Sequence, residues 1–107
     1  MSSFLSEIEQ LREEAWIGDA VLALFVREWL LRVKSREIGP AQRATLFELF
    51  TSNQFLSTFG EPTRVEAEIG RRYRSHGLSA AFSFIEGTLL ARFLNTARKK
   101  GFSLPSK

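Results

Sequence analysis

Two acidic residues stand alone inside the two most apolar stretches of this chain. Asp19 lies in the run from Ala15 to Leu31, and Glu86 lies in the run from Ala80 to Leu94. If both stretches are helices, each acid shares a face with apolar side chains three, four and seven residues further on. Because an isolated carboxylate is costly in apolar surroundings, each of these acids needs a partner.

Three interpretations of Asp19 are open. It could cap a helix that begins after Gly18, form an ion pair with a buried arginine, or hold a metal ion. The second acid bears on the third interpretation, because two apolar helices in so small a bundle are expected to touch. Facing carboxylates repel each other. Mg²⁺ would remove that repulsion, needs only one or two protein carboxylates, and can activate water in phosphodiester cleavage.

The composition narrows the possible classes of protein. The 107 residues include no cysteine and a single histidine, His76, which excludes disulfides and thiolate sites and argues against zinc. The first residues carry no basic stretch before an apolar run, and the longest apolar run contains three charged residues, so neither an export signal nor a membrane span is expected. We expect one cytoplasmic domain over residues 1–107, with 101–107 as a frayed tail.

The spacing of apolar residues predicts an all-α fold, a compact helical bundle with no strand. Gly39-Pro40, the turn at 60–63 and the segment Ser75–Gly77 are expected to separate its elements. The predicted helices are 6–14, 16–34, 41–59, 63–74 and 79–99. Residues 51–53 favour caps and could divide the third of these helices into two.

The formal charge of +3 is unevenly placed along the chain. Basic residues gather at 71–74 and at 98–100, while acids dominate 7–14. Local basic clusters suit a polyanion such as nucleic acid, and they equally suit a solvated face that keeps the protein soluble.

Three segments together resemble the ribonuclease III family. Residues 15–21, Ala-Trp-Ile-Gly-Asp-Ala-Val, look like the leading signature of that family, in which a hydrophobic-Gly-Asp-Ala/Ser-hydrophobic segment begins a central helix. Ala15 and the pair Val26-Arg27 bring the match closest to the Mini-ribonuclease III branch. Residues 66–75 resemble the acidic helix of that branch, and 81–87 fall where the family has its second signature, Ala-Phe-Glu-Ala-Leu-Ile/Leu-Gly. The likeness spans about residues 11–94.

The second signature can be aligned in two ways, and the choice decides the second acid. In the first alignment the family's metal-binding Glu falls on Ser83, and Glu86 lies one helical turn later, a displacement of about 5 Å. In the second alignment, residues 65–70, Val-Glu-Ala-Glu-Ile-Gly, match the signature, and Glu66 falls at the position of the family's metal-binding Glu. Residues 71–74 then follow where the family has a buried apolar continuation. We favour Glu86 and expect Glu66 on the surface.

The resemblance implies a Mg²⁺-dependent endoribonuclease that hydrolyses phosphodiester bonds in double-stranded or structured RNA, of the type that matures ribosomal RNA. Asp19 and Glu86 would be its catalytic residues and its metal ligands. Arg71, Arg72 and Arg74 would contact RNA phosphates, since such RNA is held by shape and backbone contacts. Lys99 and Lys100 are further candidates for phosphate contact.

Family members act as homodimers, which makes a homodimer the expected assembly. Trp16, Phe25 and Trp29 would suit a helical dimer interface, or they would fill the core. Two other functions are open. Ser83 suggests a catalytically inactive relative that binds RNA or a ribosomal partner as a helical dimer. A helical scaffold unrelated to nucleic acid, in which Asp19 is only a cap, is the other.

Overall fold

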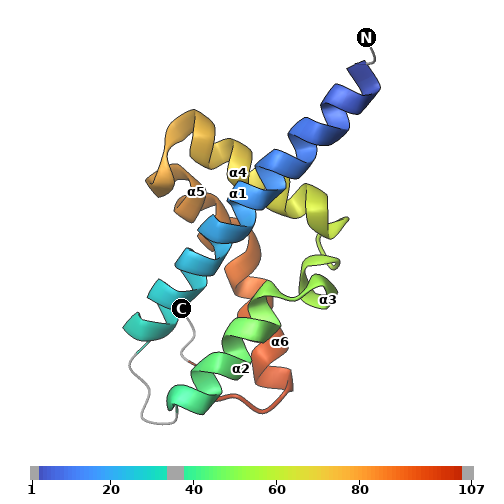
Figure 1. Cartoon of the computed structure of the whole chain (residues 1–107). Coiled ribbons are helices and arrows are strands. Elements are labelled where there is room, and N and C mark those ends of the chain that lie inside the picture. The colour runs from blue at the N-terminus through green and yellow to red at the C-terminus, as the bar shows by residue number, and fades with distance from the viewer. Residues whose placement is uncertain (1–2, 34–37, 105–107) are drawn as a thin grey trace.

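The computed structural model describes residues 3–33 and 38–104, and this part of the chain is mostly helical, without a strand. The predicted all-α class is therefore confirmed. Figure 1 shows one long helix, α1, with the shorter elements packed along it. The elements in order are α1 (Ser3–Arg32), α2 (Pro40–Thr51), α3 (Asn53–Leu56), α4 (Pro62–His76), α5 (Leu78–Ile85), the π-helical turn η1 (Glu86–Leu90) and α6 (Ala91–Lys99).

Helix α1 is continuous where two helices were predicted. Residues 6–14 and 16–34 were expected to be separate, yet one helix of 30 residues spans both as far as Arg32. No proline interrupts this stretch, and a single glycine such as Gly18 is tolerated inside a long helix. Asp19 thus lies within a helix, so the interpretation of Asp19 as a helix cap is wrong. Lys34 lies outside the described residues.

The other helix boundaries follow local signals. The Ser52 side chain accepts a hydrogen bond from the Phe55 backbone N–H at 3.1 Å, and it separates α2 from α3 as its residue type suggested. Pro62 occupies the first turn of α4, whose N-cap is Glu61. Helix α4 ends at Gly77, whose positive φ of 92° is readily adopted only by glycine.

Aromatic side chains from four elements form the centre of the core. The rings of Phe50 and Phe93 lie 4.2 Å apart between centroids, and Trp29 packs edge-on to Phe93 at 6.0 Å. Phe25 contacts both Phe50 and Phe82. Phe25 and Trp29 are buried, so these two residues fill the core and leave Trp16, at 77% exposure, as the exposed member of the three aromatic residues.

The chain after Phe82 is a helix with one π-helical turn in the middle. This turn, η1, allows Ile85 before it and Leu89 and Leu90 within it all to be buried. Beyond α6, Phe102 and Leu104 pack against the core, while 105–107 lie outside the described residues. None of the described helices has the length and apolar character that crossing a membrane requires.

Candidate carboxylate site at a helix crossing

Helices α1 and α4 cross in direct backbone contact at two glycines. A Cβ placed on Gly18 would lie 1.7 Å from the Glu66 carbonyl oxygen, and one on Gly70 would lie 1.9 Å from the Glu14 carbonyl oxygen. The buried alanines Ala15 and Ala67 lie next to the crossing in sequence. Small residues therefore let the two helices approach more closely than any larger side chain would permit.

This close crossing brings the carboxyl groups of Asp19 and Glu66 together. Burial raises the pKa of Glu66 to about 7, and a side-chain hydrogen bond with Asp19 and the negative charges of Asp19 and Glu61 act in the same direction. The acid that meets Asp19 is thus Glu66, the residue of the second alignment.

The two acids differ from expectation in their exposure. Asp19 is exposed and Glu66 is half-buried, whereas the sequence suggested an apolar setting for Asp19 and a surface position for Glu66. The expectation for Asp19 was wrong because it considered only the apolar neighbours on the same helix, and not what covers that helix. Helix α4 covers only one side of that part of α1, and Ala20 on the other side is exposed.

Glu86 and Ser83 belong to neither of the two helices that cross. Glu86 is the first residue of η1 and is exposed, and Ser83 on α5 is exposed as well. Most apolar side chains of this segment pack in the core, whereas the Glu86 side chain is exposed to solvent and needs no buried partner. The reason for expecting Glu86 to have a charged or metal partner, its burial among apolar side chains, is therefore absent.

Two of the three arginines predicted to contact RNA are held by acids of the same chain. Arg71 Nη2 lies 3.2 Å from Glu14 Oε1, and Arg71 also pairs with Glu68. Arg72 Nε lies 2.9 Å from Glu68 Oε2, which is the expected i,i+4 pair, and its guanidinium stacks over Phe84.

The third of these arginines, Arg74, differs from its neighbours. It is exposed, and in the described part of the chain no ion pair involves it. It borders a polar pocket between the first half of α1 and the end of α4, together with Glu9 and Glu13. Of the three, Arg74 is the cation most available to an external anion.

The two carboxyl groups at the crossing offer hard oxygen donors, the ligand type that Mg²⁺, Ca²⁺ and Mn²⁺ prefer. Within residues 3–33 and 38–104, no group of three or more His, Cys, Asp or Glu side chains could hold a metal ion. Mg²⁺ retains several waters and is commonly bound through one or two carboxylates and substrate phosphates. The Asp19–Glu66 pair offers that minimal set, in which two hard oxygen donors repel each other when both are ionised.

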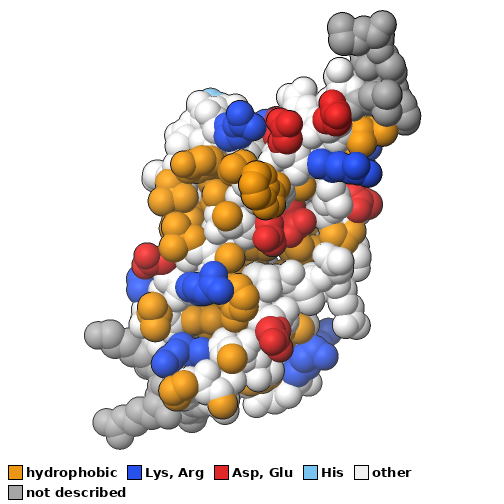
Figure 2. Space-filling view, viewed as in Figure 1, with side chains coloured by type: hydrophobic (Ala, Val, Ile, Leu, Met, Phe, Trp, Pro, Cys, Tyr) orange, Lys and Arg blue, Asp and Glu red, His pale blue; other side chains and the backbone are white. Residues whose placement is uncertain are grey.

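A stripe of exposed side chains runs along α1 beside this site. The stripe has spacings of four, four, three and four residues, which keep it on one helix face, and Arg27 is its only charged member. Figure 2 shows apolar side chains gathered over the middle of α1 and the adjoining α5. The α1 stripe consists of Trp16, Ala20, Leu24, Arg27 and Leu31.

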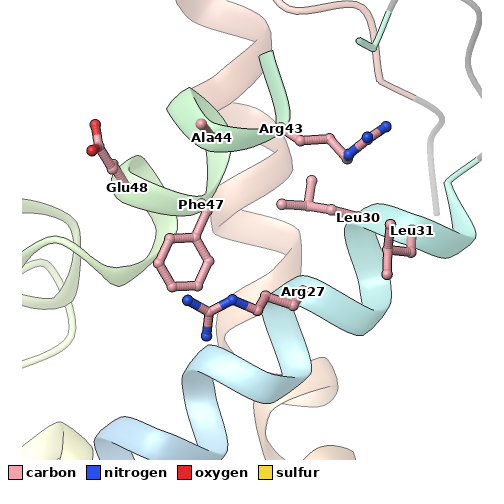
Figure 3. A pocket seen from close by; sticks show the side chains of 7 residues that line it. All are labelled: Arg27, Leu30, Leu31, Arg43, Ala44, Phe47 and Glu48. Carbon is pink, nitrogen blue, oxygen red and sulfur yellow. The ribbon is translucent and has the colours of Figure 1, made fainter. Parts of the chain in front are cut away.

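The α1 stripe ends at a pocket of about 460 Å³ between α1 and α2. Arg27 and Leu31 belong to both the stripe and the pocket, as Figure 3 shows. The Arg27 guanidinium lies 4.3 Å from the centre of the Phe47 ring, in a cation–π contact. The apolar surface of α1 thus continues into a hollow that α2 closes on its far side.

Sequence reasoning missed the pairing of Glu66 with Asp19, although the sequence held one usable signal. Ala15 and Gly18 are three residues apart, as are Ala67 and Gly70, so each pair lies on one helix face, and small residues on one face let another helix approach closely.

Comparison of the chain with family models, with curated proteins and with solved structures finds no match.

Proposed function

We propose that this protein is a Mg²⁺-dependent endoribonuclease that hydrolyses phosphodiester bonds in double-stranded or structured RNA, with Asp19 and Glu66 as its metal-binding acids. The observation that carries the proposal is the contact of these two carboxyl groups at the Gly18–Gly70 crossing. Both glycines and both acids come from segments that resemble the two ribonuclease III signatures, in the alignment that places Glu66 on the signature Glu.

The chemistry follows from the oxygen donors. A bound Mg²⁺ would help to ionise water and would stabilise the leaving oxygen of a phosphodiester. Asp19 and Glu66 would each supply carboxylate oxygen and leave room for water and a phosphate. Glu66 is ionised mostly above pH 7, so its capacity to hold the ion rises through neutral pH. We therefore place Glu66, in preference to Glu86, in the role of the second acid.

Arg74 is the favoured phosphate contact among the three arginines, because Arg71 and Arg72 already pair with Glu14 and Glu68. The homodimer also belongs to this proposal. A second copy that covers the α1 stripe would bury Trp16, Leu24 and Leu31, which are 77%, 40% and 68% exposed in the single chain.

A second candidate function is RNA binding without cleavage by the same helical dimer. It is favoured by the composition of the site, since among the described residues no third acid joins Asp19 and Glu66 in a group that could hold a metal ion. It predicts salt-sensitive binding of structured RNA that does not depend on Mg²⁺ and yields no products.

The test compares cleavage of a structured RNA in Mg²⁺ by the parent protein and by three isosteric variants. Asp19→Asn and Glu66→Gln should each lower the rate at least a hundredfold, while Glu86→Gln, the matched control, should cut like the parent. Loss of activity in Glu86→Gln with retention in Glu66→Gln would assign the second acid to Glu86. RNA binding by a parent protein that produces no cleavage would establish the second candidate function.

A further inference from the structure

A second electrostatic contact joins α1 and α4, and the proposed chemistry does not use it. The Glu14 side chain is almost fully buried, at 8% exposure of the residue. Arg71 donates to it from Nη2 at 3.2 Å, and Gln10 donates from Nε2 at 3.3 Å. Glu14 and Arg71 are 57 positions apart in sequence, so this ion pair holds two separate helices together.

The geometry of the crossing relates this contact to the acid pair. The backbone of Gly18 approaches Glu66, and the backbone of Gly70 approaches Glu14, so the two helices run in opposite directions where they touch. Glu14 lies five residues before Asp19, and Glu66 lies five residues before Arg71. The ion pair and the acid pair therefore flank the glycine contact on opposite sides, about 7.5 Å apart along each helix.

The glycines allow close backbone approach but offer no side chains that interlock across the contact. Directional contacts between the two helices therefore come from the side chains on either side of the glycines, and the Glu14–Arg71 ion pair is one of them. The Glu14–Arg71 attraction opposes a movement of α4 away from α1, and such a movement would also separate Asp19 from Glu66. Burial of Glu14 strengthens the attraction, because water screens it less than it would screen an exposed pair.

We propose that Arg71 is a positioning residue whose ion pair with Glu14 holds α4 against α1 and so keeps the Asp19 and Glu66 carboxylates within reach of one ion. The part of this inference that concerns the ion rests on the proposed function, whereas the mechanical part does not. Arg71 acts through the helices and contacts neither acid of the pair.

The mechanical part can be measured without metal and without RNA. The chain has no cysteine, so spin labels on Glu28→Cys in α1 and Ser75→Cys in α4, both at exposed positions, report a single distance distribution by pulsed electron resonance. Without Mg²⁺, Arg71→Ala should broaden or shift this distribution. Arg72→Ala is the matched control and should leave the distribution unchanged, because Arg72 pairs only within α4 and stacks on α5.

A second background separates positioning through Glu14 from a general structural role. If Arg71 acts through its ion pair with Glu14, Arg71→Ala should change the distribution much less in a Glu14→Gln background, because the ion pair is already absent there. Arg71→Lys should preserve most of the parent distribution, because it keeps the positive charge. An unchanged distribution in Arg71→Ala, or an equally large change in the Glu14→Gln background, would overturn the inference. Arg71→Gln supplies the same comparison if Arg71→Ala does not fold.

The effect of Arg71 on Mg²⁺ binding is measured separately, through the thermal stabilisation that Mg²⁺ produces. Arg71→Ala should raise at least tenfold the Mg²⁺ concentration that gives half of the maximal thermal stabilisation, and Arg72→Ala should not. A parent protein that Mg²⁺ does not stabilise would contradict the proposed function and leave the distance result standing. Equal Mg²⁺ requirements in the parent and in Arg71→Ala would contradict the positioning role alone.

Discussion

Glu66 has the largest pKa change found among the described side chains, and its cause is local. Burial, hydrogen bonding with Asp19 and the neighbouring negative charges raise the pKa of Glu66 from 4.5 to about 7. Between these two values the folded protein binds more protons than the unfolded chain. The contribution of Glu66 to the free energy of unfolding is therefore greatest below the pKa of this group in the unfolded chain, and it is lost as the pH rises toward 7.

The expected loss between pH 4.5 and pH 7.5 is about 1 kcal/mol after allowance for solvent screening of a half-exposed group. Glu66→Gln should remove this slope, because the amide does not titrate, and should be more stable than the parent at pH 8. Urea unfolding at several pH values measures both effects. Glu86→Gln, which alters an exposed acid outside the crossing, should keep the parent slope. A parent slope that persists in Glu66→Gln would assign the proton uptake to another group.

The arginines of α4 give a second prediction at this scale. If RNA is bound, Arg74→Gln should weaken binding and lower the slope of log affinity against log salt by about 1, as expected for the loss of one phosphate contact. Arg72→Gln should change that slope little, because Glu68 already neutralises Arg72. Filter binding or fluorescence anisotropy at several salt concentrations measures the slopes. A larger effect of Arg72→Gln would place the RNA on the other side of α4.

At the scale of elements, the crossing of α1 and α4 depends on the absence of two side chains. Gly18→Ala would place a methyl group well inside contact distance of a backbone carbonyl, which cannot move aside as a flexible side chain can. The helices must separate, so the variant should lose about 3 kcal/mol or more of unfolding free energy.

The matched control for this prediction is Gly87→Ala in η1. A Cβ on Gly87 would meet no atom within 4 Å, so this substitution should be neutral or stabilise by about 0.5 to 1 kcal/mol through helix propensity. Chemical denaturation of both variants tests the comparison. Similar stability of Gly18→Ala and the parent would mean that the crossing can open without cost, and the Asp19–Glu66 contact would then lose its support.

At the scale of the whole molecule, the α1 stripe is the exposed apolar surface that we expect a partner to bury. Its exposed tryptophan and leucines lie on one helix face and continue into the pocket beside Phe47. Because water is released when such a face is buried, a second copy of the chain is the expected occupant in the proposed homodimer.

Trp16→Glu should therefore shift the protein to monomers while leaving the stability of the monomer nearly unchanged, since Trp16 makes little contact with the core. Sedimentation velocity across a concentration series measures the assembly, and circular dichroism checks the fold. Leu78→Glu, at an exposed apolar position on α5 outside the stripe, is the control and should not alter the assembly. A parent protein that is monomeric throughout would remove the homodimer from the proposal.

Local chemistry in the sequence determined the helical class and most helix ends. Ser52, Pro62 and Gly77 act through their own backbone geometry or through bonds to residues a few positions away, so no knowledge of the fold was needed to recognise them. The helix break predicted at residue 15 and the cap interpretation of Asp19 were wrong, because a glycine such as Gly18 can precede the start of a helix or allow a neighbouring helix to approach, and only the presence of α4 distinguishes the two cases.

The identity of the acid beside Asp19 was decided by tertiary structure. Apolar periodicity describes one helix at a time, and by that measure Glu86 was the better partner. Glu66 reaches Asp19 across 47 positions of sequence only because two glycines bring their helices into backbone contact. The same packing leaves Trp16 exposed while burying Trp29 on the same helix. Residue type and spacing can specify which face of a helix is apolar, but what covers that face is set by the other elements.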